Sequence, residues 1–198
     1  MTAETHPVLV VNNAEDEVHD FVRPIQDLLA AAQVSCQVIS YKQLTRTIVL
    51  RYRAVILSAS PLGNDIVEHH QVYYRWLLTH WGPVLGICAG HQIIGRLFGG
   101  ELRRSVESEV GLSTVRVLCP DPLLKGLARE FTVLQHHNDS VTCPSEFVVL
   151  ASSARCENQI MRHRARPIYS TQFHAERSGV EIITNFLSLA LLHMEFCW

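Results

Sequence analysis

Short segments built almost entirely from apolar residues recur along the first half of the chain, and they constrain its fold more than any other feature. Val8–Val11, Ala54–Ser58 and Pro83–Ile87 lack a regular alternation of polar and apolar residues, which is typical of strands buried on both faces. Between them, Glu17–Ala32 and Asp65–His80 repeat apolar residues at helical spacing. Strands alternating with helices in this way predict a mostly parallel sheet covered by helices on both faces.

The remaining segments extend this prediction. Val34–Ile39 is predicted to be a strand, Gln92–Phe98 a short helix that stops at Gly99–Gly100, and Val180–His193 a closing helix. Pro24 lies within the first helical pattern, so that helix is expected to start late or to kink there. Later strands follow one another without helices between them, and they are expected to add an antiparallel ribbon at the sheet edge. These strands are Leu112–Leu118, Phe131–Leu134, Phe147–Ala151 and Ile168–Phe173.

Length and composition indicate a single domain, residues 1–198. Of the 198 residues, 47% are hydrophobic and 18% are charged, which suits one apolar core and argues against disorder. The formal net charge of −2 gives no reason to expect nucleic acid or an anionic membrane as a partner. No stretch approaches the roughly 18 apolar residues of a membrane span. Met1–His6 lacks the pattern of a signal peptide, so a cytoplasmic location is expected.

The cysteines and histidines do not predict a metal site. Six cysteines occur at irregular spacing without a C-x-x-C pair, and most are expected to be small buried hydrophobes, with Cys197 a loose thiol. Neighbouring residues on a strand point to opposite faces, so His136 and His137 are poorly placed to chelate one ion. The pair His69–His70 on a predicted helix is no better placed. We expect neither a metal nor a cofactor.

Cys88 is the candidate nucleophile. Gly86-Ile87-Cys88-Ala89-Gly90 follows a buried strand and opens a helix, which is the G-x-nucleophile-x-G pattern of a sharp strand-to-helix elbow. Small flanking residues let the two elements approach, and the turn lifts the sulfur out of the sheet edge. Free N–H groups and the dipole at the helix N-terminus favour the thiolate, the nucleophilic form. The pattern alone also fits a buried structural cysteine.

A second motif, Gln172-Phe173-His174-Ala175-Glu176, supplies the partners that a cysteine nucleophile requires. His174 follows an apolar strand at the carboxyl edge of the predicted sheet, where ligands bind in open α/β folds. It is the candidate base, and Glu176 can turn back to orient it. The loop Leu57–Gly63 could supply one oxyanion N–H, and Ala89 the other. Taken alone, each pattern also fits a solvated histidine–glutamate pair or an ordinary turn.

These motifs together resemble the class I glutamine amidotransferases, most of all the free-standing glutaminase subunit of two-subunit GMP synthetases. The resemblance implies a flavodoxin-like fold and hydrolysis of the glutamine side-chain amide, with ammonia passed to a separate ATP-dependent synthetase. The matching segments, in the family's order, are Val8–Asn13, Ile56–Ser58, Leu85–Gly100, His137–Asp139, Pro167–Tyr169 and Gln172–Glu176.

The resemblance also implies a role for each matching residue. Cys88 would attack the carboxamide carbon, His174 would take the thiol proton and protonate the departing ammonia, and Glu176 would orient His174. The amides of Ala89 and Ser60 would form the oxyanion hole. The α-amino and α-carboxylate groups of the substrate would be held by Gln92, His136, Asn138 and Asp139.

The oxyanion loop departs from the family's pattern. The family usually has Ser-Gly-Gly-Pro-Gly, whereas this chain has Ser58-Ala59-Ser60-Pro61-Leu62, whose side chains are expected to disfavour a backbone flip. Leu62 is also expected to crowd the pocket or to reshape its specificity. Two alternatives to a synthetase-linked glutaminase therefore stay open. One is a stand-alone γ-glutamyl hydrolase or peptidase of the same superfamily, and the other is a catalytically weak regulatory or binding subunit.

Overall fold

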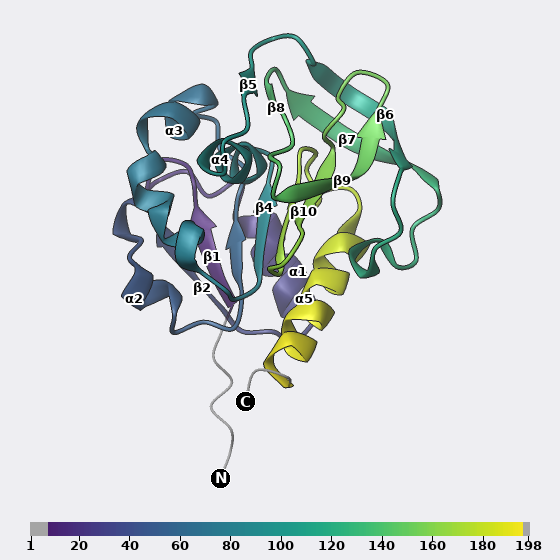
Figure 1. Ribbon diagram of the computed structural model, residues 1–198. Coiled ribbons are helices and arrows are strands. Elements are labelled where there is room, and N and C mark those ends of the chain that lie inside the picture. Colours follow the sequence, from purple (N-terminus) through teal and green to yellow (C-terminus); the bar gives the residue numbers. More distant parts are fainter. Residues whose placement is uncertain (1–7, 196–198) are drawn as a thin grey trace.

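The computed structural model describes residues 8–195, so the predictions for Met1–His6 and Cys197 lie outside the described residues. Within this range, nine strands form one mixed sheet in the order β2-β1-β3-β4-β11-β10-β9-β6-β7 (Figure 1). Parallel pairing joins β2 (Cys36–Ser40), β1 (Val8–Asn12), β3 (Val55–Leu57), β4 (Val84–Ile87) and β11 (Ile168–Thr171). Antiparallel pairing adds β10 (Ile160–His163), β9 (Phe147–Ser153), β6 (Glu109–Val117) and β7 (Glu130–His137). The predicted parallel sheet with an antiparallel ribbon is confirmed, but the assignment of Ile168–Phe173 to the ribbon is wrong, because β11 pairs parallel with β4.

Helices cover both faces of the parallel half, as predicted (Figure 1). On one face lie α1 (Arg23–Ala31) and α5 (Val180–Glu195), and on the other lie α2 (Arg46–Val49), α3 (Asn64–His69) and α4 (Ala89–Leu97). Each set packs on its own hydrophobic cluster, so the sheet separates two cores.

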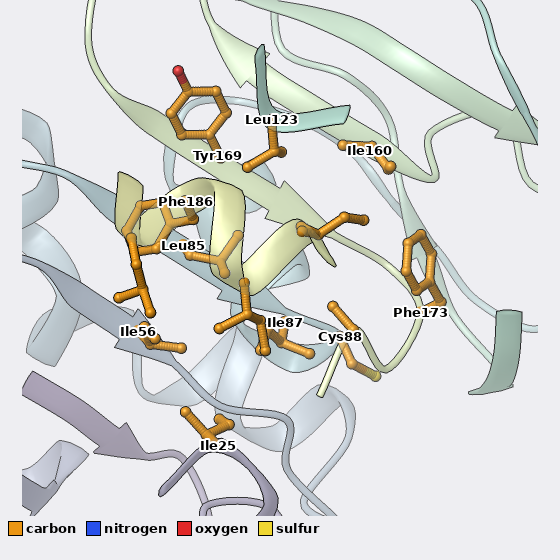
Figure 2. Close-up of a cluster of buried hydrophobic side chains, with 14 of the residues drawn as sticks. Ile25, Ile56, Leu85, Ile87, Cys88, Leu123, Ile160, Tyr169, Phe173 and Phe186 are labelled. Atoms are coloured by element: carbon orange, nitrogen blue, oxygen red, sulfur yellow. The ribbon is translucent and has the colours of Figure 1, made fainter. Parts of the chain in front are cut away.

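The two faces of β1 show why this strand is apolar throughout. Val8 and Val10 belong to the cluster under α1 and α5, whereas Leu9 and Val11 belong to the cluster on the opposite face. Successive residues of a strand point to opposite faces, so every position must be apolar when both faces are covered. Figure 2 shows part of the first cluster, where side chains of α1, the sheet and α5 pack together. They include Ile25, Ile56, Leu85, Ile87 and Phe186.

Two helices differ from the predicted ones in extent. α1 starts at Arg23 with Pro24 in its first turn, where a missing N–H costs nothing, so the expected late start is confirmed. The continuous helix predicted for Asp65–His80 is wrong, because α3 is followed by a 3₁₀ helix, η2 (Gln71–Thr79). His70 lies between them in a non-helical conformation and stacks on Tyr41, with ring centroids 5.1 Å apart. Tertiary packing thus outweighs the local helical pattern at this residue.

Several short elements were not predicted. They are α2, β10, the two-stranded sheet of β5 (Leu102–Arg103) and β8 (Ser140–Val141), and the 3₁₀ turns η1 (Tyr41–Gln43) and η3 (Pro122–Leu124). Elements of two to four residues are too short to show a hydrophobic period. β10 matters most for the architecture, because it joins the antiparallel ribbon to β11 and so to the parallel half.

The predicted stop of α4 at Gly99–Gly100 is confirmed. Gly99 has φ +90°, a left-handed conformation that suits glycine. Its N–H donates to the Arg96 carbonyl at 3.2 Å, and the Gly100 N–H donates to the Gly95 carbonyl at 2.8 Å. This is the Schellman pattern, which satisfies carbonyl groups at the end of a helix.

Candidate active site

The strand-to-helix elbow predicted at Cys88 is present. Cys88 lies between β4 and α4 with φ +51° and ψ −100°, a strained conformation for a residue with a Cβ. Its N–H donates to the Thr171 carbonyl of β11 at 2.8 Å, which ties the elbow to the neighbouring strand. The side chain is buried at the edge of the first hydrophobic cluster, beside Ile87 (Figure 2). The elbow therefore fixes Cys88 at the carboxyl ends of β4 and β11.

Gly86 and Gly90 are required at the elbow because backbone atoms approach them closely. A Cβ at Gly86 would lie 2.6 Å from the Gly90 carbonyl oxygen, and a Cβ at Gly90 would lie 2.6 Å from the Leu57 carbonyl oxygen of β3. Neither contact can be relieved by rotating a side chain. The small residues predicted to let strand and helix approach thus have a direct steric reason.

Gly90→Ala is expected to lower the free energy of unfolding by about 1–3 kcal/mol, measured by urea denaturation. The clash with β3 is typical of overpacking, and it should exceed the gain in helix propensity from alanine. Gly82→Ala is a matched control, because its Cβ would meet only the imidazole of His80. Unchanged or increased stability of Gly90→Ala would contradict the close packing of α4 on β3.

His174 and Glu176 lie in the segment that follows β11, and they contact one another. His174 Nδ1 is 2.7 Å from Glu176 Oε1, and both residues are buried. A carboxylate only accepts hydrogen bonds, so Nδ1 carries a proton and donates it. Nε2 is then the ring nitrogen that is free of Glu176. The imidazole of His174 thus lies at the cavity beside Cys88 with the Glu176 carboxylate behind it.

The pKa of His174 reflects both neighbours. Burial by itself lowers the pKa of this imidazole, but hydrogen bonds with Cys88 and Glu176 and the negative charges of these groups outweigh it. The net effect raises the pKa of His174 to about 10.

The predicted site residues line one cavity of about 590 Å³ beside Cys88. This volume lies within the range typical of sites for small molecules. Those that line it are Ser60, Cys88, Ala89, Gln92, His136, Asn138, Asp139 and His174. Glu176 lies behind His174 rather than at the cavity wall. Residues from four separate parts of the chain therefore converge on one pocket.

Gln92 and the segment after β7 are held together by direct hydrogen bonds. Gln92 Nε2 donates to the Asp139 carbonyl at 2.7 Å and to Gln172 Oε1 at 3.2 Å. Gln172 Nε2 in turn lies 3.9 Å from Cys88 Sγ. Ser108 Oγ donates to Asn138 Oδ1 at 3.3 Å. The predicted substrate residues thus form an ordered wall next to the sulfur.

Leu62 does not crowd the pocket, so that expectation is wrong. Its side chain packs against the hydrophobic cluster under α2, α3 and α4, whereas Ser60, Pro61 and Gly63 line the cavity. The turn is closed by the Leu62 N–H, which donates to Ser60 Oγ at 3.1 Å. The position of Leu62 in the motif does not indicate that its side chain packs into the core rather than into the cavity.

Sequence reasoning missed several residues around the cavity. Asp20, Phe21, Leu134, His137 and Arg177 also line it, and Gln172 contacts the sulfur. Gln172 had a signal, because it precedes His174 by two residues in the same motif.

Within residues 8–195, one group of potential metal ligands is present, formed by Glu109, His137 and Cys156. Every helix in that range is too short or too polar to span a bilayer.

The sequence matches the family described as "Glutamine amidotransferase class-I" over residues 14–194. It is 30% identical over 193 residues to the glutamine-hydrolyzing GMP synthase subunit of Pyrococcus furiosus, and the match covers 92% of this chain and 97% of that protein. Over 148 residues it is 42% identical to the corresponding protein of Saccharolobus solfataricus, covering 70% of this chain and 77% of that one. A crystal structure from Thermoplasma acidophilum, described as a GMP synthase subunit, has a TM-score of 0.87 at 27% identity and 96% coverage of both chains.

Proposed function

Because this chain belongs to the class I glutamine amidotransferase family, we propose that it hydrolyses the side-chain amide of L-glutamine at Cys88. The observation that carries the proposal is the elbow at Cys88, with His174 and Glu176 in hydrogen-bonding order beside the same cavity. The similarity to glutamine-hydrolyzing GMP synthase subunits over most of the chain supports the same substrate. A cytoplasmic location stays a prediction.

The proposed reaction proceeds through a thioester. Cys88 gives its proton to His174 and attacks the carboxamide carbon, and the oxyanion that forms accepts hydrogen bonds from the amides of Ala89 and Ser60. His174 then protonates the leaving nitrogen, so ammonia departs and a γ-glutamyl thioester remains on Cys88. Water, deprotonated by His174, attacks the thioester carbon and releases glutamate, and the proton returns to the thiolate–imidazole pair.

We assign the substrate's α-groups to the wall formed by Gln92 and residues 136–139. Gln92 and Asp139 already contact one another, and His136 and Asn138 line the same cavity. Their polar groups suit the charged amino and carboxylate groups of glutamine, which a purely apolar pocket would reject. No metal and no cofactor enters this scheme.

We further propose that the ammonia is used by a separate ATP-dependent synthetase, as the GMP synthase names of the relatives suggest. The test combines the purified chain with the synthetase component of a two-subunit GMP synthase from the same source. Glutamine-dependent GMP formation should require both proteins, whereas ammonium chloride should support the synthetase alone. Glutamate release should rise when the partner is added.

The same assay separates the alternatives. Cleavage of γ-glutamyl peptides in preference to glutamine, with no effect of the synthetase, would replace the proposal by a stand-alone hydrolase. No cleavage of either substrate in the presence of an active synthetase would favour a regulatory subunit. The position of Leu62 outside the cavity removes one reason to expect an altered specificity.

A further inference from the structure

A buried glutamate–histidine contact lies next to the proposed substrate wall. Glu109 and His137 are opposite one another in the β6–β7 register, and His137 Nε2 is 3.4 Å from Glu109 Oε2. Their side chains are only 4% and 1% exposed, so both groups are shielded from water. Ser113 and Ser153 also donate to the carboxylate, at 2.6 and 2.9 Å. Burial would raise the pKa of Glu109, but these hydrogen bonds and His137 outweigh it and lower the pKa.

The second ring nitrogen of His137 contacts the backbone of Asp139. Nδ1 is 3.1 Å from the Asp139 carbonyl oxygen, which can only accept, so Nδ1 must donate. His137 thus lies between the Glu109 carboxylate and the backbone of Asp139.

Further polar contacts connect Asp139 with Cys88. The Asp139 carbonyl oxygen accepts a second hydrogen bond, from Gln92 Nε2 at 2.7 Å, so two side chains fix its position. Gln92 also donates to Gln172, whose Nε2 lies 3.9 Å from Cys88 Sγ. A continuous set of polar contacts thus runs from His137 to the sulfur.

We propose that Glu109 and His137 are positioning residues that hold residues 138–139 in the conformation that binds the α-amino and α-carboxylate groups of glutamine. The inference rests on the proposed glutaminase function, and it assigns a role to two residues that do not themselves contact the reacting atoms. Loss of the contacts of Glu109 and His137 should weaken substrate binding more than it slows the chemical step.

A metal ion held by Glu109, His137 and Cys156 is the competing interpretation, because their ligand atoms lie within 4.8 Å of one another. Two observations disfavour it. Protein donors already occupy the Glu109 carboxylate. It accepts a hydrogen bond from Gln159 Nε2 at 2.5 Å in addition to those from Ser113 and Ser153. Burial and the nearby Glu107 raise the pKa of the Cys156 thiol, whereas zinc binds the thiolate.

The test compares steady-state kinetics of Glu109→Gln, His137→Leu and His137→Asn. We expect the KM for glutamine to rise about tenfold in the first two, as for loss of a hydrogen bond to a charged group, with kcat changed less than about threefold. Asparagine places an amide nitrogen near the position of Nδ1, so His137→Asn should rescue part of the KM. Glu130→Gln is the matched control on the same hairpin, because Glu130 is exposed at the far end of β7, and it should leave KM unchanged.

Labelling of Cys88 distinguishes a positioning role from a merely structural one. Iodoacetamide lacks the α-groups and should react equally with wild type and variants, whereas a glutamine-analogue chloroketone below saturation should react about tenfold more slowly with the variants. Three results would overturn the inference. They are equally slower labelling of the variants by both reagents, a lower kcat at unchanged KM, and one zinc ion per purified chain. If iodoacetamide labels Cys88 of the wild type but the analogue does not, the proposed function is wrong. If the analogue labels Cys88 of the wild type and of the variants at equal rates, only the further inference is wrong.

Discussion

Replacing Cys88 by alanine is expected to reduce glutamate release from glutamine by roughly 10⁴-fold or more, because the proposed γ-glutamyl thioester forms on the Cys88 sulfur. The variant keeps the Cβ and the backbone amide, so the elbow and the hydrogen bond to Thr171 can remain. Glutamine should still bind, which isothermal titration calorimetry can measure. The decisive measurement is glutamate release in the presence of the synthetase, with ammonia-dependent synthesis as the reference.

Cys143→Ala is a suitable control for this experiment. Cys143 is half-buried and lies outside the cavity, and burial raises the pKa of its thiol to about 11, so little thiolate forms near neutral pH. This variant should retain full activity, and the glutamine-analogue chloroketone should still label it at Cys88. Residual hydrolysis by Cys88→Ala at the wild-type rate would exclude the cysteine mechanism, whatever the family resemblance suggests.

The elbow at Cys88 and the contact between His174 and Glu176 could be predicted from the sequence because these residues lie in two short, self-contained motifs. The glycines around Cys88 indicate an elbow without knowledge of distant contacts, and His174 and Glu176 are two residues apart. Continuous apolar strands such as Val8–Val11 likewise indicate burial on both faces, which the two hydrophobic clusters confirm. Local patterns were sufficient wherever the chain neighbours of a residue determine its environment.

The contact between Glu109 and His137 could not be predicted in this way. Its formation depends on the register between β6 and β7, which is set by long-range pairing rather than by either strand alone. A shift by one residue would direct His136 inward in place of His137, because alternate residues face opposite sides. The sequence showed two adjacent histidines but not which of them is buried. The break at His70 has a similar origin, since it accompanies stacking on the distant Tyr41.

His174→Asn is expected to lower kcat/KM for glutamine by about 10³-fold and to remove the alkaline limit of the reaction. Asparagine cannot take the thiol proton or protonate departing ammonia, and general acid–base transfer typically contributes 10²- to 10⁴-fold. In the wild type, Cys88 and Glu176 raise the pKa of His174 to about 10 against the effect of burial. A group with a raised pKa stays protonated below that value, so the acid form persists until the pH approaches 10. Wild-type activity should therefore fall above about pH 10, and this limb should be absent from the variant.

Alkylation of Cys88 provides the complementary measurement. Without the imidazolium beside it, the thiolate in His174→Asn loses its cationic partner, and alkylation by iodoacetamide at pH 6 should become slower than in the wild type. His19→Asn, a change of histidine outside the cavity, should alter neither the alkaline limb nor the rate of alkylation. A variant of His174 with the wild-type alkaline limb would show that another group donates the proton to ammonia, and the acid role would then have to be reassigned within the cavity.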